Sequence, residues 1–113
     1  MNILFWGNGK RGLNCLKALL KNGYEIKAVI AHPNGTLVEP FANEKGIEVV
    51  CPQDPNEPSF QKYLKQKNAD IFSLAAYGKI LKQATIDLAK VICINLHGGR
   101  LPQYRGSSPM NWS

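Results

Sequence analysis

Apolar runs alternate with amphipathic stretches along the chain. Five apolar runs predict strands, at residues 2–6, 26–31, 47–50, 69–75 and 91–96. Between them, apolar residues at helical spacing and helix-ending glycines predict helices around residues 13–20, 38–45, 60–64 and 83–89. Most of the strands are continuously apolar, which is typical of a parallel sheet covered on both faces.

This alternation predicts an α/β fold: a doubly wound, mainly parallel, Rossmann-like sheet with strand order 3-2-1-4-5. In such a sheet, ligands bind at the carboxyl ends of the strands, in the crevice where the strand order reverses. We expect the turns at residues 7–12 and 77–81 to open onto that crevice, between the first and fourth strands. Residues 97–107 are expected to be irregular, and a helix is expected to begin at Ser108 and Pro109.

The composition fits one ordinary globular domain, with 113 residues of which 44% are hydrophobic. No apolar run approaches the roughly 20 residues that a membrane-spanning helix needs. The short apolar start has no basic residue before it, so it is interpreted as a strand and not as a signal peptide. We therefore expect a cytoplasmic protein without a membrane span.

The formal net charge is +6. It indicates either a solvated basic surface or an anionic partner, namely a polyglutamylated cofactor, a phosphate-bearing substrate or a nucleic acid. The basic residues are spread along the chain, which argues against a dedicated nucleic-acid-binding module. The three cysteines show no metal-binding spacing, so no metal site is predicted, and Cys15 and Cys93 are expected to be buried thiols.

A glycine motif, Gly7-x-Gly9-x-x-Gly12, follows the first strand and opens a helix, as in dinucleotide-binding proteins. The second strand ends at His32 without the acidic residue that would bind the ribose of NAD, and His32 is a poor ligand for the extra phosphate of NADP. A helix N-terminus with Lys10 and Arg11 beside it suits an anion. The alternatives are a substrate phosphate bound by Gly9, Lys10, Arg11 and Gly12, or a purely structural turn.

Asn95 and His97 are two residues apart at the end of the fifth strand, so their side chains point to the same face. An asparagine amide can stabilise a developing oxyanion, and a histidine can accept and return a proton near neutral pH. The alternative is that both residues only cap loops.

The segment at residues 94–112, Ile-Asn-Leu-His-Gly-Gly-Arg-Leu-Pro-Gln-Tyr-Arg-Gly-Ser-Ser-Pro-Met-Asn-Trp, closely resembles the signature of the 10-formyltetrahydrofolate-dependent formyltransferases. A second segment at residues 76–81, Ala-Tyr-Gly-Lys-Ile-Leu, is similar to the folate-pocket loop of that family. The opening strand and the glycine turn are also similar, so the resemblance covers the whole chain.

The resemblance implies transfer of a formyl group from 10-formyltetrahydrofolate to a primary amine. Asn95 would hold the oxyanion of the tetrahedral intermediate, and His97 would handle protons. Arg105 would contribute to substrate binding. The residues that would bind the folate cofactor, largely through backbone and apolar contacts, are Leu74, Tyr77, Gly78, Lys79, Ile80, Leu81 and Cys93.

The family also uses an Asp a few tens of residues after the Asn-x-His element. Residues 1–113 are therefore expected to be the N-terminal portion of a truncated catalytic domain, inactive by itself. Gly98-Gly99-Arg100 replaces the Ser-Leu that is common in the transfer-RNA enzymes, which favours a nucleotide-linked amino sugar over methionyl-tRNA as the amine acceptor. A small purine-pathway amine is a further candidate. The competing interpretations are a non-catalytic, Rossmann-like nucleotide-binding module and a remnant that serves only as an interaction surface.

Overall fold

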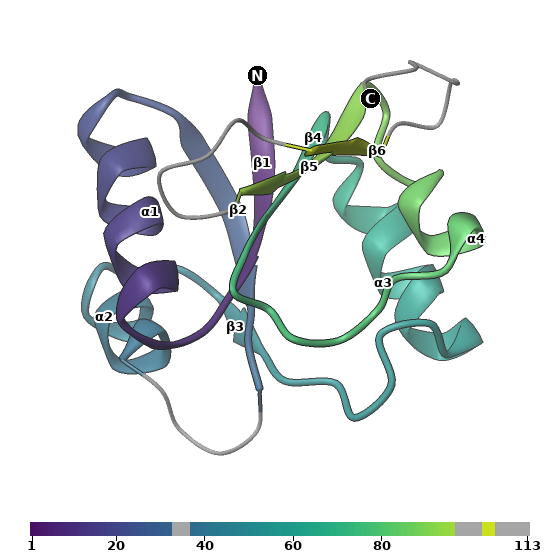
Figure 1. Cartoon of the computed structure of the whole chain (residues 1–113), viewed down its shortest axis with the longest axis horizontal. Coiled ribbons are helices and arrows are strands. Elements are labelled where there is room, and N and C mark those ends of the chain that lie inside the picture. The colour runs from purple at the N-terminus through teal and green to yellow at the C-terminus, as the bar shows by residue number, and fades with distance from the viewer. Residues whose placement is uncertain (33–36, 97–102, 106–113) are drawn as a thin grey trace.

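The computed structural model describes residues 1–32 and 37–96 and the backbone of residues 103–105. The strands are β1 (Asn2–Gly7), β2 (Glu25–Ile30), β3 (Val49–Val50), β4 (Ile71–Ala75), β5 (Ile92–Leu96) and β6 (Gln103–Arg105). The helices are α1 (Gly9–Lys21), α2 (Val38–Glu44), α3 (Pro58–Lys67) and α4 (Gln83–Ile86). The sheet forms a central layer, with α1 and α2 on one face and α3 and α4 on the other (Figure 1).

The strand order is β3-β2-β1-β4-β5-β6, and the first five of these strands are parallel. The predicted order 3-2-1-4-5 is therefore confirmed. The order reverses between β1 and β4, where Trp6 pairs with Leu74 and Gly7 with Ala75. The carboxyl ends of these two neighbouring strands lie at the same edge of the sheet, because the strands are parallel.

Part of the segment at residues 97–107, which was expected to be irregular, forms the strand β6. β6 pairs antiparallel with β5, with Asn95 opposite Gln103 and Cys93 opposite Arg105. Three residues among glycines and a proline are too few to show a strand period in the sequence. The rest of that segment lies outside the described residues, as does the helix expected from Ser108.

The continuously apolar sequence of β1 reflects burial on both faces of the sheet. Leu4 and Trp6 point into the core beneath α3 and α4, whereas Phe5 points into the core beneath α1 and α2. The Trp6 ring packs edge-to-face against Phe60, at 6.1 Å, and against Tyr77, at 5.4 Å. Trp6 thereby links β1 to the loop that follows β4.

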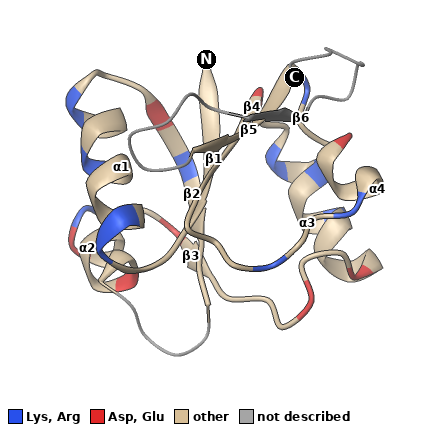
Figure 2. Cartoon of the chain, viewed as in Figure 1, with Lys and Arg blue, Asp and Glu red and all other residues tan. Residues whose placement is uncertain are grey.

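The lysines and arginines are spread over both sides of the sheet (Figure 2). Among the described residues, ion pairs join Lys67 to Glu48 at 2.8 Å and Lys90 to Asp70 at 3.6 Å. Both pairs are partly exposed, and such pairs contribute little stability. No helix within the described ranges has the length and apolar character required to cross a membrane.

Candidate functional site

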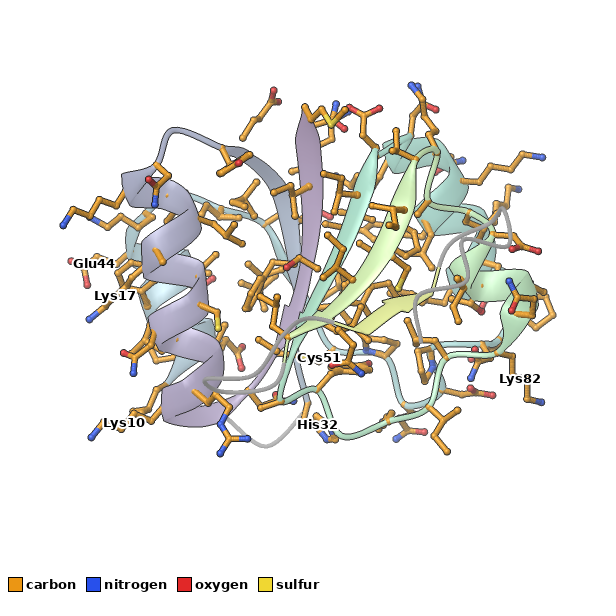
Figure 3. All side chains as sticks on the ribbon, turned by 45° about the horizontal axis from the view of Figure 1, so that its top comes forward. Lys10, Lys17, His32, Glu44, Cys51 and Lys82 are labelled. Atoms are coloured by element: carbon orange, nitrogen blue, oxygen red, sulfur yellow. The ribbon has the colours of Figure 1, made fainter. Side chains whose placement is uncertain are left out.

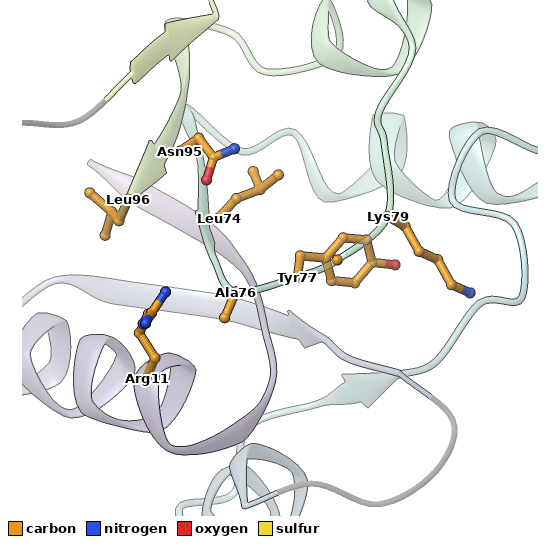
Figure 4. Close-up of a pocket in the computed structure, with 8 residues that line it drawn as sticks. Arg11, Leu74, Ala76, Tyr77, Lys79, Asn95 and Leu96 are labelled. Atoms are coloured by element: carbon orange, nitrogen blue, oxygen red, sulfur yellow. The ribbon is translucent and has the colours of Figure 1, made fainter. Parts of the chain in front are cut away.

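A cavity of about 160 Å³ lies at the carboxyl ends of β4 and β5 (Figure 4). It is bordered by three segments that are far apart in the sequence: the start of α1, the loop after β4 and the end of β5. We call it the outer cavity. The residues that line it are Arg11, Leu74, Ala76, Tyr77, Gly78, Lys79, Asn95 and Leu96.

A second cavity, of about 120 Å³, adjoins the first, and we call it the inner cavity. Leu74, Lys79 and Asn95 line both cavities, so these residues form the shared wall. The other residues that line the inner cavity are Ile80, Leu81, Ile86 and Cys93. Most of its lining side chains are therefore aliphatic, with polar groups among them, which suits a flat ring whose faces pack on apolar walls and whose edge is held by polar groups.

Every residue predicted from the sequence to bind the cofactor lines one of these cavities. The predicted catalytic residue Asn95 lies in their shared wall, with its side chain half-buried. The binding and catalytic roles of these residues stay predictions. His97 and the side chain of Arg105 lie outside the described residues.

The side chain of Lys79 points away from Asn95 (Figure 4). Its Nζ donates hydrogen bonds to the carbonyl of Gln53, at 2.6 Å, and to the carbonyl of Pro52, at 3.3 Å. The ammonium group is thus engaged with the loop after β3. Lys79 can present its backbone and carbon stem to the cavities, while its ammonium group binds the carbonyls of the loop after β3.

Only Arg11 of the predicted phosphate-binding residues lines the outer cavity. The structure shows a packing role for the neighbouring glycines, because the turn lies against the last residue of β4. A Cβ atom added to Gly7 would lie 2.6 Å from the carbonyl oxygen of Ala75, and one added to Gly12 would lie 3.1 Å from it. α1 already begins at Gly9, so the predicted turn and the helix overlap.

The electrostatics of the α1 N-terminus favour an anion. Its first turn has no acidic residue, and no side chain caps it. Lys10 and Arg11 are exposed at this positive end of the helix, and Figure 3 shows Lys10 projecting outward from it. Anion binding by Gly9, Lys10 and Gly12 stays a prediction.

Tyr77 is the ionisable aromatic residue of the outer cavity wall, and it is only 3% exposed. Burial raises the pKa of Tyr77 well above its usual range, and nearby Cys51 and Asp54 raise it further. The phenol is therefore neutral at physiological pH and cannot serve as a proton acceptor.

The cysteines show no sign of reactive chemistry. Cys93 is buried, as predicted. Cys15 is only half-buried, so the prediction of a buried thiol is wrong at that position. Burial raises the pKa of Cys15 and of Cys51, which disfavours the reactive thiolate. Within the described part of the chain, no group of three or more His, Cys, Asp or Glu side chains could hold a metal ion.

The formyl transferase family model matches residues 1–113 of this chain. The chain belongs to the formyl transferase family. Among similar curated proteins are the methionyl-tRNA formyltransferases of Caldanaerobacter subterraneus subsp. tengcongensis, 36% identical, and of Acetivibrio thermocellus, 34% identical. Each match covers 100% of this chain and 40% of the relative, so the chain spans about two fifths of the length of these relatives. The alignment with the Caldanaerobacter protein runs over 124 positions, whereas this formyl transferase chain has 113 residues. Within the aligned region, the Caldanaerobacter protein therefore has residues that this chain lacks.

Sequence reasoning missed one residue that shapes the cavities of this formyl transferase chain. The side chain of Asn56 donates to the carbonyl of Ile80, at 2.9 Å, and accepts from the backbone N–H of Lys82, at 2.7 Å. It also accepts from the hydroxyl of Thr85, at 2.8 Å. Asn56 therefore fixes the loop between β4 and α4. The sequence places it in a proline-rich polar loop, where no pattern marks such a role.

Proposed function

We propose that this chain contributes the donor-binding site and the oxyanion-stabilising amide of a transferase that moves a formyl group from 10-formyltetrahydrofolate to a primary amine. The main support is that Asn95 lies in the wall shared by an inner cavity lined mainly by aliphatic side chains and an outer cavity that includes Arg11. Membership in the formyl transferase family supports the same reaction.

The inner cavity has suitable chemistry for the pterin ring of the donor. Leu74, Leu81 and Ile86 provide apolar walls, and the backbone of residues 79–81 runs beside them. A flat heterocycle can pack against such walls while its edge pairs with backbone groups. The formyl group would then lie near Asn95, toward the outer cavity.

The bound donor supplies a carbonyl carbon that an amine can attack. Negative charge then develops on the formyl oxygen, and the amide N–H of Asn95 can donate a hydrogen bond to it. When this intermediate collapses, the bond between the formyl carbon and N10 of the donor breaks, and tetrahydrofolate leaves with a proton on N10. Asn95 does not titrate, so another group must accept the proton that the amine loses. Sequence resemblance gives this role to His97, and the neutral phenol of Tyr77 cannot take it.

The acceptor belongs on the side of the outer cavity, next to the α1 N-terminus. Nucleotide-linked amino sugars and methionyl-tRNA both contain phosphate. We propose that Arg11, with Lys10 and the backbone of residues 9–12, binds a phosphate of the acceptor, and that Arg105 assists. The names of the relatives favour methionyl-tRNA, whereas Gly98-Gly99-Arg100 favours an amino sugar.

The test is a formyl-transfer assay with the full-length protein, 10-formyltetrahydrofolate and a panel of amines that includes both acceptor types. We expect one phosphate-bearing acceptor to be formylated. Arg11→Ala should raise the KM for that acceptor by about tenfold, since charge-assisted hydrogen bonds contribute about 1.5–3 kcal/mol, and leave folate affinity unchanged. Lys21→Ala, at the other end of α1, is the matched control. Transfer to none of the amines would reject the proposed function.

The Ile80 side chain provides a separate test of the donor site. It is 80% exposed although it borders the inner cavity, so a bound ligand can cover it. Ile80→Ser should weaken folate binding by about fivefold, because part of a side-chain burial of about 1.5–3 kcal/mol is lost. The melting temperature should stay unchanged. Val91→Ser is the control, since Val91 is 44% exposed and precedes the amino end of β5. Equal effects of both substitutions on folate binding would contradict this placement of the ligand.

A non-catalytic nucleotide-binding module finds less support. His32, which follows β2, is engaged within the protein: its imidazole contacts the carbonyl of Tyr77, and its backbone N–H donates to Asn8 at 2.7 Å. It is therefore not available to bind a ribose phosphate. A thermal-shift comparison separates the two functions, because a folate should stabilise the protein and a dinucleotide should not.

A further inference from the structure

The loop after β4 begins with a backbone conformation that L-amino acids rarely adopt. Ala76 has a φ of 61°, in the left-handed region, although it has a Cβ atom. It follows the last residue of β4 directly and lines the outer cavity. Such a conformation persists only where the surrounding structure holds it, and it occurs preferentially at functional sites.

Asn8 provides the contacts that hold this loop. Its Nδ2 donates hydrogen bonds to the carbonyl of Tyr77, at 2.9 Å, and to the carbonyl of Ala76, at 3.4 Å. Its Oδ1 accepts from the backbone N–H of His32, at 2.7 Å. The His32 ring then contacts the same Tyr77 carbonyl. One asparagine therefore joins the ends of β1 and β2 to the loop after β4.

The position of Asn8 shows that this arrangement has a local cost. Asn8 is the N-cap residue of α1, with the extended backbone that an N-cap adopts, and asparagine is among the best capping residues. Its side chain nevertheless makes no capping hydrogen bond. The capping group of α1 is used to hold the loop instead, and the helix end that borders Arg11 is left uncapped.

We propose that Asn8 is a positioning residue for the donor site. By fixing the carbonyls of Ala76 and Tyr77, it sets the course of the first half of the loop, at residues 77–79, whereas Asn56 holds the second half at Ile80 and Lys82. Residues 77–79 border the outer cavity, and Lys79 borders both cavities. This inference rests on the proposed function, since it assigns the loop to folate binding. The loop geometry itself can be tested without a folate.

The decisive variant is Asn8→Ser in the full-length protein. Serine caps a helix about as well as asparagine, so α1 should stay stable, but its hydroxyl is too short to reach the Tyr77 carbonyl. We expect the Kd for 5-formyltetrahydrofolate, a stable isomer of the donor, to rise about tenfold. The KM for the donor should rise by the same factor. The kcat should change by less than about twofold, because Asn95 is untouched.

Asn22→Ser is the matched control. Asn22 is the C-cap residue of the same helix, and its Nδ2 donates to the carbonyl of Ala18, at 2.7 Å, far from both cavities. The same substitution there should leave folate affinity unchanged. If Asn8→Ser and Asn22→Ser have the same small effect on affinity, or if Asn8→Ser lowers kcat and leaves the KM for the donor unchanged, the proposal is overturned.

Backbone NMR chemical shifts separate this proposal from the proposed function, because they report the loop geometry without a folate. Asn8→Ser should shift the amide resonances of Tyr77 and Gly78, whose peptide groups contain the two carbonyls that Asn8 binds, and Asn22→Ser should not. Shifted resonances in a protein that binds no folate would leave the loop contact standing and reject the folate site. Unshifted resonances would overturn the positioning role.

Ala76→Gly covers the case in which Asn8→Ser fails to fold. Glycine removes the strain of the left-handed conformation, so the melting temperature should rise. It also widens the range of loop conformations, so folate affinity should fall about threefold. Opposite changes in stability and affinity support a positioning role, and a rise in both would overturn it.

Discussion

In the full-length protein, replacing Asn95 by alanine should slow the proposed formyl transfer by about 10²–10³-fold, the usual effect of losing one oxyanion donor. The protein should stay folded, because the side chain is half-buried and the backbone is fixed by pairing with Leu74 on one side and Gln103 on the other. Affinity for 5-formyltetrahydrofolate should change by less than about threefold, since the amide acts mainly on the transition state. The measurements are kcat, folate Kd and melting temperature.

Asn95→Asp is the matched variant, because it keeps the size of the side chain and removes the donor. Its carboxylate would repel a developing oxyanion, so it should be at least as slow as Asn95→Ala. Activity close to wild type in either variant would contradict the role given to Asn95. The family resemblance predicts a comparable loss for His97→Ala.

Gly7→Ala should destabilise the fold by about 3 kcal/mol, at the upper end of the usual cost of overpacking a core. The added Cβ would lie 2.6 Å from the carbonyl oxygen of Ala75 and 2.8 Å from a ring carbon of Phe5. The carbonyl belongs to the last residue of β4 and cannot move without disturbing the sheet. Urea unfolding measures the change, and a large part of a typical domain stability of about 5–15 kcal/mol should be lost.

Gly9→Ala is the control from the same motif. A Cβ on Gly9 would meet nothing within 4 Å, and its φ of 67° makes alanine strained but not excluded. The expected cost is about 1 kcal/mol. Gly7, unlike Gly9, does not have a positive φ, so its expected cost comes from the contact with β4. Equal destabilisation by the two substitutions would contradict the large cost assigned to that contact.

The sheet could be predicted because its signal is local. Each central strand is a continuous apolar run, and glycines and prolines separate the runs from the helices. The parallel order then brings Tyr77 and Asn95 to one edge, so the walls of the cavities could be anticipated as well. The strand β6 could not be predicted, because its three residues form a strand only by pairing with β5.

The contacts that shape the cavities could not be predicted. Asn8 and Tyr77 are 69 positions apart, and Asn56 and Ile80 are 24 apart. A single hydrogen bond between a side chain and a distant carbonyl leaves no period in the sequence. The direction of the Lys79 side chain could not be predicted either, because it depends on the position of the loop after β3, whose carbonyls bind the ammonium group.

The outermost strands of the described sheet are its shortest: β3 has two residues and β6 has three. Each therefore offers few unpaired N–H and C=O groups to a neighbouring molecule, whereas the longer, strongly apolar strands are enclosed between others. Short edges of this kind make a poor template for intermolecular strand addition, the first step of β-aggregation. Extending β3 with apolar residues should therefore make the protein prone to fibrils during refolding, even though every central contact would be preserved.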